Sequence, residues 1–241
     1  PTIDLQLVED DDGGVVNYLF AGLVPKGETT IVFGDGESAK SLIVLLMAVC
    51  HSIGYPTPWG PAPEVGKVLI LDWETNAKTT ANRLRRICAG MGVTAPSIRY
   101  RACMRSLPDE LPSIREEISR EKITCVMIDS IGFAMTGALT DDETARGALA
   151  CMRQMEPATR ICVAHVNAAT ARDPKTPGRP FGSAFFWNGM RSGIEVRRAQ
   201  DDQIDGQIDV GLYHRKTNDG WHHKPVALQV GFDGLAGPIA F

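Results

Sequence analysis

Short apolar runs recur along the chain, and each is followed by a stretch in which apolar residues are spaced differently. The runs are almost continuously apolar and are bounded by turn signals, which is typical of strands buried on both faces of a parallel sheet. Four such runs lie at residues 29–33, 67–72, 122–129 and 161–166. A weaker strand is predicted at 97–101.

The stretches between the runs have helical spacing. Between residues 77 and 91, for example, Leu84, Ile87, Cys88 and Met91 fall on one face of a helix. Strands that alternate with helices predict an α/β fold, with a mostly parallel sheet that is flanked by helices and binds ligands at the carboxyl ends of its strands. The other predicted helices run from 42 to about 53, from 109 to 120 and from about 143 to 155.

The last part of the chain has a different pattern. Asp219-Gly220 lies between two alternating runs, which is a strong hairpin signal. The prediction is therefore a C-terminal antiparallel hairpin extension. Its parts are a helix from Phe185, a strand at 193–198, hairpin strands at 206–215 and 221–232, and a short strand near 238–241.

Length and composition are those of one globular domain. The chain has 241 residues, of which 44% are hydrophobic and 22% charged, enough for one large α/β core. Residues 1–16, with an acidic run at 9–12, are expected to form an N-terminal arm, and residues 17–241 the folded domain. The net charge of −4 argues against general coating of nucleic acid, but not against a local basic loop.

The six cysteines are scattered, without the C-x-x-C spacing of a zinc or redox site. We expect reduced, buried thiols and a cytoplasmic protein. The sequence contains neither a signal peptide nor an apolar span of about 18 residues, so no membrane partner is expected.

The strongest chemical signal follows the first strand. A glycine-bearing loop and Lys40-Ser41 lie between the run 29–33 and a predicted helix, which is the context of a P-loop. Backbone N–H groups of such a loop surround a phosphate, and the helix N-terminus adds positive potential. Lys40 is expected to reach the β- and γ-phosphates of ATP, and Ser41 to bind Mg²⁺. The predicted nucleotide-binding loop consists of Gly34, Asp35, Gly36, Glu37, Ser38, Ala39, Lys40 and Ser41.

One position departs from the P-loop pattern G-x-x-x-x-G-K-[ST]. The residue before Lys40 is Ala39 instead of glycine, and its methyl group crowds the phosphate and disfavours a positive φ. A chance glycine-rich turn that only starts a helix is the alternative interpretation.

Two carboxylates are predicted at strand ends beside the P-loop. Asp129 closes the run 122–129 as a Walker B aspartate does and would hold the Mg²⁺ shell, or it is an ordinary turn residue. Glu74 follows the run 67–72 and is the candidate that orients and polarises the attacking water. Asp72 is a weaker candidate, and a role of Glu74 in starting the next helix is the alternative.

The end of the fourth run and the loop after it carry further candidates. His165 would contact the γ-phosphate and report its presence to the following loop, or it is a core histidine. The loop 168–182 carries Arg172, Lys175 and Arg179, which suit contact with a nucleic-acid backbone, or a solvated surface.

His214, Arg215 and Lys216 are predicted at the tip of the late hairpin. Cations at that tip would reach the ATP of a neighbouring subunit, as an arginine finger does. An exposed basic turn is the alternative. His222-His223 lack an evident third ligand, so no zinc site is predicted there.

Together these elements resemble the RecA-like ATPases, which are AAA ATPases in the broad sense. Among them the chain is most similar to the RepA-type hexameric helicases, with the DnaB-type replicative helicases as wider relatives. The resemblance covers about residues 17–225. The segments that carry it are the lead-in 19–27, Leu71–Glu74 with the Arg-rich helix after it, Val126–Ser130, Val163–Asn167, Gly182-Ser183 with Arg191, and Lys216–Gly220.

The resemblance implies a role for each matching residue. Glu74 would be the catalytic carboxylate, Asp129 the Walker B aspartate and His165 the sensor. Lys216, with Arg215 or Arg191, would act in trans. The loops after two of these strands would line a central DNA channel, and an alanine before the P-loop lysine would affect turnover more than nucleotide binding.

The predicted function is an ATP-binding and ATP-hydrolysing RecA-like motor with Mg²⁺ as its cofactor. It would assemble into a homo-oligomeric ring, with a hexamer implied by the resemblance, or a filament, and act as a DNA helicase or translocase on single-stranded DNA in replication. Two alternatives stay open. One is a slow-turnover, nucleotide-dependent DNA-binding or recombination-mediator module, and the other is a nucleotide-binding regulator without DNA.

Overall fold

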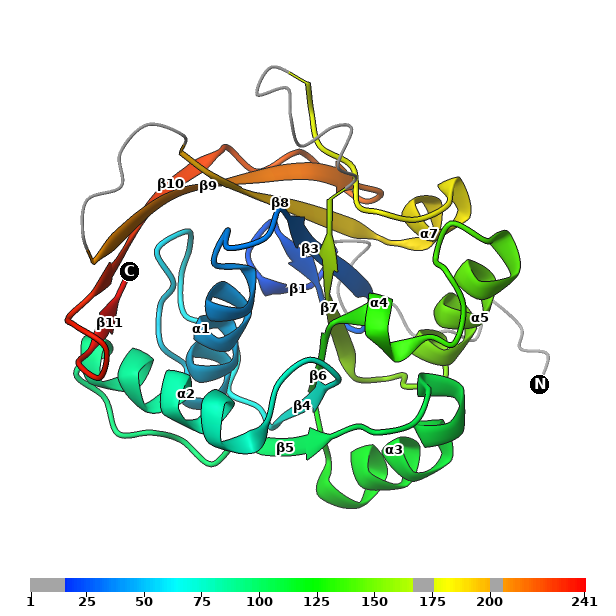
Figure 1. Ribbon diagram of the computed structural model, residues 1–241, viewed down its shortest axis with the longest axis horizontal. Helices are drawn as coiled ribbons and strands as arrows, with labels where there is room; N and C mark the ends of the chain where they lie inside the picture. The colour runs from blue at the N-terminus through cyan, green and yellow to red at the C-terminus, as the bar shows by residue number, and fades with distance from the viewer. Residues whose placement is uncertain (1–15, 167–175, 200–205) are drawn as a thin grey trace.

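The computed structural model describes residues 16–166, 176–199 and 206–241, in which strands and helices alternate (Figure 1). The strands are β1 (Tyr18–Phe20), β2 (Val24–Pro25), β3 (Thr29–Gly34), β4 (Val68–Asp72), β5 (Arg99–Ala102), β6 (Cys125–Asp129), β7 (Thr159–His165), β8 (Ser192–Arg198), β9 (Gln207–Thr217), β10 (Val226–Phe232) and β11 (Ile239–Ala240). The helices are α1 (Lys40–Ile53), α2 (Ala77–Met91), α3 (Leu107–Glu121), α4 (Ile131–Ala134), α5 (Asp142–Arg153) and α7 (Ala184–Gly189).

A nine-stranded sheet forms the centre of the molecule, in the order β11-β10-β9-β8-β3-β7-β6-β4-β5. The six strands from β8 to β5 run parallel to one another, and β9, β10 and β11 extend the sheet in antiparallel fashion. β1 and β2 pair separately, ahead of the first sheet strand. The prediction of a mostly parallel sheet with a C-terminal antiparallel extension is confirmed.

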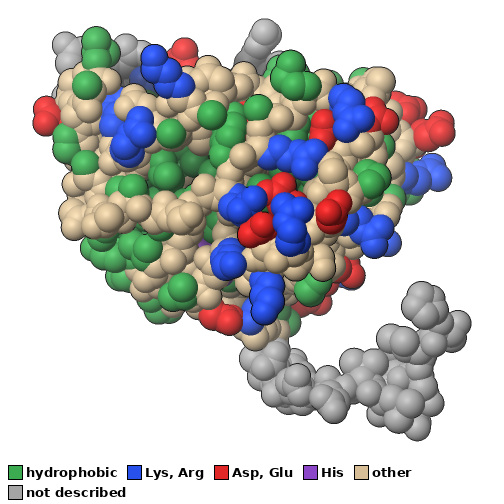
Figure 2. Space-filling view, turned by 90° about the horizontal axis from the view of Figure 1, so that it is seen from below, with side chains coloured by type: hydrophobic (Ala, Val, Ile, Leu, Met, Phe, Trp, Pro, Cys, Tyr) green, Lys and Arg blue, Asp and Glu red, His purple; other side chains and the backbone are tan. Residues whose placement is uncertain are grey.

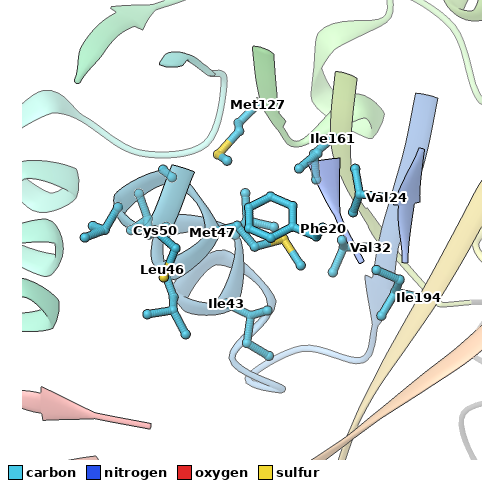
Figure 3. Close-up of a cluster of buried hydrophobic side chains, with 14 of the residues drawn as sticks. Phe20, Val24, Val32, Ile43, Leu46, Met47, Cys50, Met127, Ile161 and Ile194 are labelled. Carbon is cyan, nitrogen blue, oxygen red and sulfur yellow. The ribbon is translucent and has the colours of Figure 1, made fainter. Parts of the chain in front are cut away.

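The apolar strands are buried because helices cover both faces of the sheet. α1 and α2 lie on one face, and α3, α4, α5 and α7 lie on the other (Figure 1). Alternate residues of a strand point to opposite faces, so Val32 belongs to the core under α1, whereas Ile31 and Phe33 belong to the core under α3 and α5. Figure 3 shows the first core, in which Met47 and Phe20 lie between the helix and the strands.

The edge strand β5 is tied to α3 by ion pairs. Arg99 contacts Glu117 and Glu121, and Arg101 contacts Glu110 and Glu117. Figure 2 shows the molecule from below, where positive and negative side chains are interspersed. Because the charges are interspersed, this face carries no field of a single sign. Charged side chains along an edge strand also disfavour pairing of that strand with another chain. In the described part of the chain, no helix has the length and apolar character needed to cross a membrane.

The element boundaries correct three predictions. The segment between the predicted strand at 122–129 and the predicted helix from about 143, where no helix was predicted, contains the short helix α4. Residues 221–225, predicted as strand, precede β10. β9 extends to Thr217, so His214–Lys216 lie within a strand and not at the tip of the hairpin. Most of the predicted N-terminal arm, residues 1–15, lies outside the described residues.

Candidate active site

The carboxyl ends of neighbouring parallel strands bring the predicted site residues to one edge of the sheet. Gly34 at the end of β3 lies beside His165 of β7, and Asp72 of β4 lies beside Asp129 of β6. A cleft of about 530 Å³ opens at this edge. Among its lining residues are Gly36–Leu42, Glu74 and His165. The register of the sheet therefore groups residues that are far apart in sequence.

The predicted P-loop connects β3 to α1. Ser38 Oγ donates a hydrogen bond of 2.8 Å to the Asp35 carbonyl oxygen, and Gly36 N donates one of 2.8 Å to Asp35 Oδ1. Gly34 must be glycine, because a Cβ atom there would lie 2.2 Å from the Val196 carbonyl oxygen. The loop is thus held by its own short-range bonds and by close contact with β8.

Ala39 adopts the left-handed conformation that a glycine would adopt easily. Its φ is 65° and its ψ is 16°, and it forms the N-cap of α1. An L-residue with a Cβ atom pays roughly 1–2 kcal/mol in this region. The expected conflict between the methyl group and a positive φ is therefore present, and the loop keeps the backbone path of a glycine in spite of it.

Lys40 is folded into the loop. Only 7% of the residue is exposed, and Nζ donates to the Asp35 carbonyl oxygen and to Ser38 Oγ. Burial lowers the pKa of Lys40, and the nearby carboxylates of Asp129, Glu74 and Asp35 act against that shift. The ammonium group is therefore placed among backbone and carboxylate oxygens at the floor of the cleft.

Asp129 and Ser41 form a site of hard oxygen ligands. Asp129 Oδ1 is buried and has no hydrogen-bond partner within the described chain. Burial raises the pKa of Asp129 to about 6, although a hydrogen bond from Ser41 lowers it. A buried, unpaired carboxylate oxygen beside a hydroxyl fits Mg²⁺, which takes few protein ligands and completes its shell with water and phosphate oxygens. Accordingly, the described residues contain no cluster of three His, Cys, Asp or Glu side chains that could hold a metal.

Glu74 is a carboxylate that lines the cleft. Its Oε1 accepts a hydrogen bond of 2.6 Å from Ser130 Oγ and lies 3.6 Å from His165 Nε2. The side chain of Glu74 is one-quarter exposed, so water can reach it. Ser130 follows Asp129 directly, and the end of β6 therefore supplies both the Mg²⁺ candidate and the residue that orients Glu74.

Asp72 has a structural role. It is 4% exposed, and its carboxylate accepts five hydrogen bonds that occupy both oxygens. Burial raises its pKa, but the hydrogen bonds outweigh burial and lower the pKa overall. The donors are Glu74 N, Thr75 N, Thr75 Oγ1, Thr80 Oγ1 and Tyr100 Oη. Asp72 thus builds the turn that presents Glu74.

The predicted nucleic-acid residues are only partly described. Arg172 and Lys175 lie outside the described residues. Arg179 is exposed, in a segment that returns to the site edge, where Phe181 N donates to the His165 carbonyl oxygen at 2.7 Å. The segment that carries Arg179 is therefore bonded directly to the predicted sensor residue.

The predicted trans-acting cations lie on β9, away from the strand ends that carry the P-loop. Lys216 pairs with Gly193, which lies beside Ile31 of β3, three residues before Gly34. At about 3.3 Å per residue, Lys216 is set back by about 10 Å from the strand ends that carry the P-loop. Neither Arg215 nor Lys216 is among the residues that line the cleft of its own chain.

A β-bulge aims both cations to the same side of the sheet. The register between β8 and β9 shifts so that Gly193 faces Lys216 while Ile194 faces His214, which leaves Arg215 as the extra residue. Arg215 Nε donates to Glu195 at 2.5 Å. Lys216 Nζ donates to the carbonyl oxygens of Trp187 and Asn188 at the end of α7, at 2.7 and 2.9 Å.

The cleft contains residues that the sequence did not single out. They are Arg83, Arg86, Arg198, Val163, Ile208, Phe232 and Ile239. Arg83 and Arg86 were visible only as part of an Arg-rich helix, and their spacing of three places them on one face of α2. The apolar residues other than Val163 come from β9, β10 and β11, and only the sheet order brings those strands to the cleft.

Comparisons with known proteins identify the family and the fold of the chain. A family model described as the AAA domain matches residues 10–171. No curated protein sequence matches the chain at a significant level. The KaiC-like protein PH0186 from Pyrococcus horikoshii OT3 is similar in structure, with a TM-score of 0.58, 14% identity, and coverage of 94% of this chain and 95% of that chain.

A second solved structure, the ATPase domain of another protein, has a TM-score of 0.66 and 13% identity, with coverage of 95% of this chain and 93% of that chain. At these identities the likeness shows a shared fold. The family match covers more than half of the chain and includes the P-loop, Glu74, Asp129 and His165. The chain therefore belongs to the AAA domain family and is a RecA-like P-loop ATPase domain.

Proposed function

We propose that residues 17–241 form the motor domain of a cytoplasmic DNA helicase or translocase of the RepA type, which acts on single-stranded DNA in replication. The observation that carries the proposal is the grouping of the P-loop, Glu74 and His165 around one cleft, with Asp129 at the end of β6 and the Arg179 segment bonded to His165. The resemblance of the sequence to RepA-type and DnaB-type helicases supports the choice of a helicase among RecA-like ATPases.

The residues of the cleft divide the work of hydrolysis. The N–H groups of the P-loop and the Lys40 ammonium hold the phosphates of ATP. Glu74 orients and polarises the attacking water, and Ser130 holds Glu74 in place through the 2.6 Å bond. Asp129 and Ser41 would hold Mg²⁺, which neutralises charge on the phosphates when it is bound.

His165 connects hydrolysis to the DNA-binding segment. Its ring lies 3.6 Å from the Glu74 carboxylate, and its carbonyl oxygen accepts the bond from Phe181. A change at the γ-phosphate position therefore has a direct route to the segment that carries Arg179, with Arg172 and Lys175 before it in sequence. We expect this basic segment to contact the phosphate backbone of single-stranded DNA.

The position of Arg215 and Lys216 supports sites that are shared between subunits. They lie away from the cleft of their own chain, and in a ring the neighbouring subunit's ATP would be within their reach. In the single chain their charges are occupied by Glu195 and by the α7 carbonyl oxygens. Arg191, the other candidate, lies 3.6 Å from Glu28.

The test is steady-state ATP hydrolysis with and without single-stranded DNA, together with particle mass by light scattering. A motor is expected to show hydrolysis that DNA stimulates, and a mass several times the 26.1 kDa of one chain. Hydrolysis that DNA leaves unchanged, in a particle of one chain, would contradict the helicase and favour a nucleotide-binding regulator.

A slow-turnover DNA-binding or recombination-mediator module is the second candidate, and Ala39 is the observation that favours it. A methyl group in the left-handed position next to Lys40 stiffens the loop that must adapt to the phosphates during turnover. Strand displacement separates the two functions, because only a helicase unwinds a duplex at the expense of ATP.

A further inference from the structure

A buried carboxylate on β8 bonds to segments that are far apart in sequence. Glu195 is 2% exposed, and it is not among the residues that line the cleft. Its Oε1 accepts hydrogen bonds from Gly178 N at 3.1 Å and from Arg197 Nε at 2.6 Å. Its Oε2 accepts the bond of 2.5 Å from Arg215 Nε. Glu195 therefore joins the segment 176–180 to the bulge of β9.

The segment 176–180 is also bonded to the end of the P-loop strand. Val166, the residue after the proposed sensor His165, forms an isolated bridge with Pro180. The N–H group of Val166 donates to the Gly34 carbonyl oxygen at 3.1 Å. A continuous set of bonds thus leads from the cleft to this segment, and the buried carboxylate extends it to β9.

The segment fits closely against the carboxylate. A Cβ atom on Gly178 would lie 2.0 Å from Glu195 Oε1 and 3.4 Å from Val166 Cγ2. Arg197, which bonds to Glu195, also donates from Nη2 to the Thr176 carbonyl oxygen. A displacement of the segment therefore changes the bonds that Glu195 and Arg197 make.

Arg215 can leave this site without leaving a buried charge unpaired. Removal of one partner from a buried ion pair is costly when the other charge is left uncompensated. Here Arg197 stays on the same carboxylate. A guanidinium group can bond to both carboxylate oxygens at once, so Arg197 can replace Arg215 when it gives up the Thr176 carbonyl oxygen. The Arg215 side chain is 24% exposed, so it has a path to solvent.

We infer that Glu195 is a positioning residue that couples DNA on the segment 176–180 to Arg215, a proposed cation for the neighbouring subunit's ATP. The inference rests on the proposed function, because it requires both bound DNA and shared clefts. Without DNA, Glu195 retains Arg215. DNA that draws Arg179 outward moves the segment off Glu195. Arg197 then turns fully onto the carboxylate, and Arg215 is released towards the neighbour.

The first experiment measures ATP hydrolysis of Glu195→Gln with and without single-stranded DNA. The amide oxygen still accepts from Gly178, but the NH₂ group faces Arg215, which is also a donor. Loss of a charged hydrogen bond shifts the balance between held and released Arg215 by roughly 10- to 100-fold. The rate without DNA is expected to rise towards the rate with DNA, so that DNA no longer stimulates hydrolysis.

Two further variants test the same link and control for it. Gly178→Ala disturbs the link from the segment, because its Cβ meets Glu195 Oε1, and no buried charge is removed. It should also raise the rate without DNA. Glu110 of α3 is likewise buried and contacts two arginines, Arg101 and Arg105. Glu110→Gln should be stimulated by DNA as the wild-type chain is.

Mixtures of subunits show in which subunit Glu195 acts. When Glu74→Gln and Lys216→Ala subunits are mixed, the working clefts receive their cations from the Glu74→Gln subunits. Addition of Glu195→Gln to those subunits should remove stimulation by DNA. Addition of Glu195→Gln to the Lys216→Ala subunits should leave stimulation intact. A merely structural role of Glu195 would not distinguish the two mixtures.

The outcomes separate this inference from the proposed function. If DNA stimulates the wild-type chain and both Glu195→Gln and Gly178→Ala to the same extent, the coupling is overturned alone. Loss of stimulation through a lower rate with DNA, and not through a higher rate without it, would also overturn the coupling, as would equal behaviour of the two mixtures. A wild-type chain that DNA does not stimulate would contradict the proposed helicase, and the coupling with it.

Discussion

Ala39 occupies a backbone position that glycine fills at no steric cost. We expect Ala39→Gly to raise the free energy of unfolding by roughly 0.5 kcal/mol, because relief of the left-handed strain exceeds the added entropy of the unfolded chain. ATP should bind this variant at least as tightly as the wild-type chain. Urea unfolding and calorimetry measure the two quantities.

Glu37 is a matched control for this change, because its φ of 58° is also positive. Glu37→Gly should give a similar gain in stability, because 89% of the Glu37 side chain is exposed and its ion pair with Arg198, at 3.7 Å, lies at the surface. A fall in the stability of Ala39→Gly by more than about 1 kcal/mol would mean that the methyl group packs usefully, contrary to the strain argument.

Substitutions of Asp72 and Glu74 should have different effects, the first on stability and the second on ATP hydrolysis. Asp72→Asn weakens the acceptor of five hydrogen bonds and places an NH₂ group against donors, so we expect a loss of roughly 1–3 kcal/mol in stability. Glu74→Gln should keep the fold and ATP binding and lose hydrolysis. Thermal unfolding and ATPase assays measure the two effects. A stable but inactive Asp72→Asn, together with a Glu74→Gln that still hydrolyses ATP, would make Asp72 the catalytic carboxylate instead of Glu74.

The stability of the chain should depend on pH through His214. Burial, and then the nearby His222 and His223, lower the pKa of His214 from its usual value of 6.5 to about 4. Its Nδ1 accepts the His223 N–H at 3.0 Å, which requires the neutral ring. The stabilisation is complete above pH 6.5 and is lost as the pH falls towards 4, by about 3 kcal/mol in all.

His214→Gln provides the comparison, because an amide can both donate to Ser192 and accept from His223 without titrating. Urea unfolding of both proteins between about pH 7.5 and about pH 4.5, which spans most of the window between the two pKa values, measures the effect. Wild-type stability should fall more steeply with acid than that of the variant. Parallel profiles would show that His214 keeps an ordinary pKa.

Residues with a local signature were predictable, and residues placed by distant contacts were not. Lys40, Ser41, Asp129 and Glu74 each follow an apolar run, and their place at a strand end follows from the sequence alone. The structural role of Asp72 was not predictable, because it depends in part on Tyr100, which reaches Asp72 from the neighbouring strand β5.

At the scale of elements, the bulge in β9 determines where the cations point. Without it, Lys216 would face the opposite side of the sheet from Arg215, since neighbouring residues of a strand alternate. The sequence has no signal for this bulge. The hairpin turn at Asp219-Gly220 was recognised, but the strand before it is longer than predicted, because pairing with β8 continues to Thr217.

The position of Lys216 predicts complementation between inactive subunits. Lys216→Ala and Glu74→Gln should each abolish hydrolysis, and a mixture of the two should recover part of it. The recovery arises because some clefts then combine an intact Glu74 with a neighbour's intact Lys216. ATPase activity of mixtures at several ratios measures this, and a mixture as inactive as its components would contradict shared sites.

At the scale of the whole molecule, alternation of strands and helices was sufficient to predict an α/β fold. The order of the strands was not predictable from the residues, because β3 lies between β7 and β8, which are far from it in sequence. The same order places β9–β11 beside the cleft, and the hairpin extension was therefore predicted without its part in the site.

Activity per chain should depend on protein concentration. If each cleft needs a cation from another chain, dilution separates the chains and leaves clefts without a cation. We expect specific ATPase activity to fall on dilution in step with the mass from light scattering. Constant activity at the mass of one chain, 26.1 kDa, would show that the cleft is complete in a single subunit.

If Lys216 acts in trans as proposed, its set-back from the strand ends that carry the P-loop gives the subunit a donor side and an acceptor side. A contact between the donor side of one subunit and the cleft of the next is heterologous and runs head to tail. Two subunits therefore cannot both supply Lys216 to each other's cleft through one two-fold interface. An open row of subunits always ends in one cleft without a donor. Only a closed cycle supplies every cleft, so ring closure itself would add the last active site.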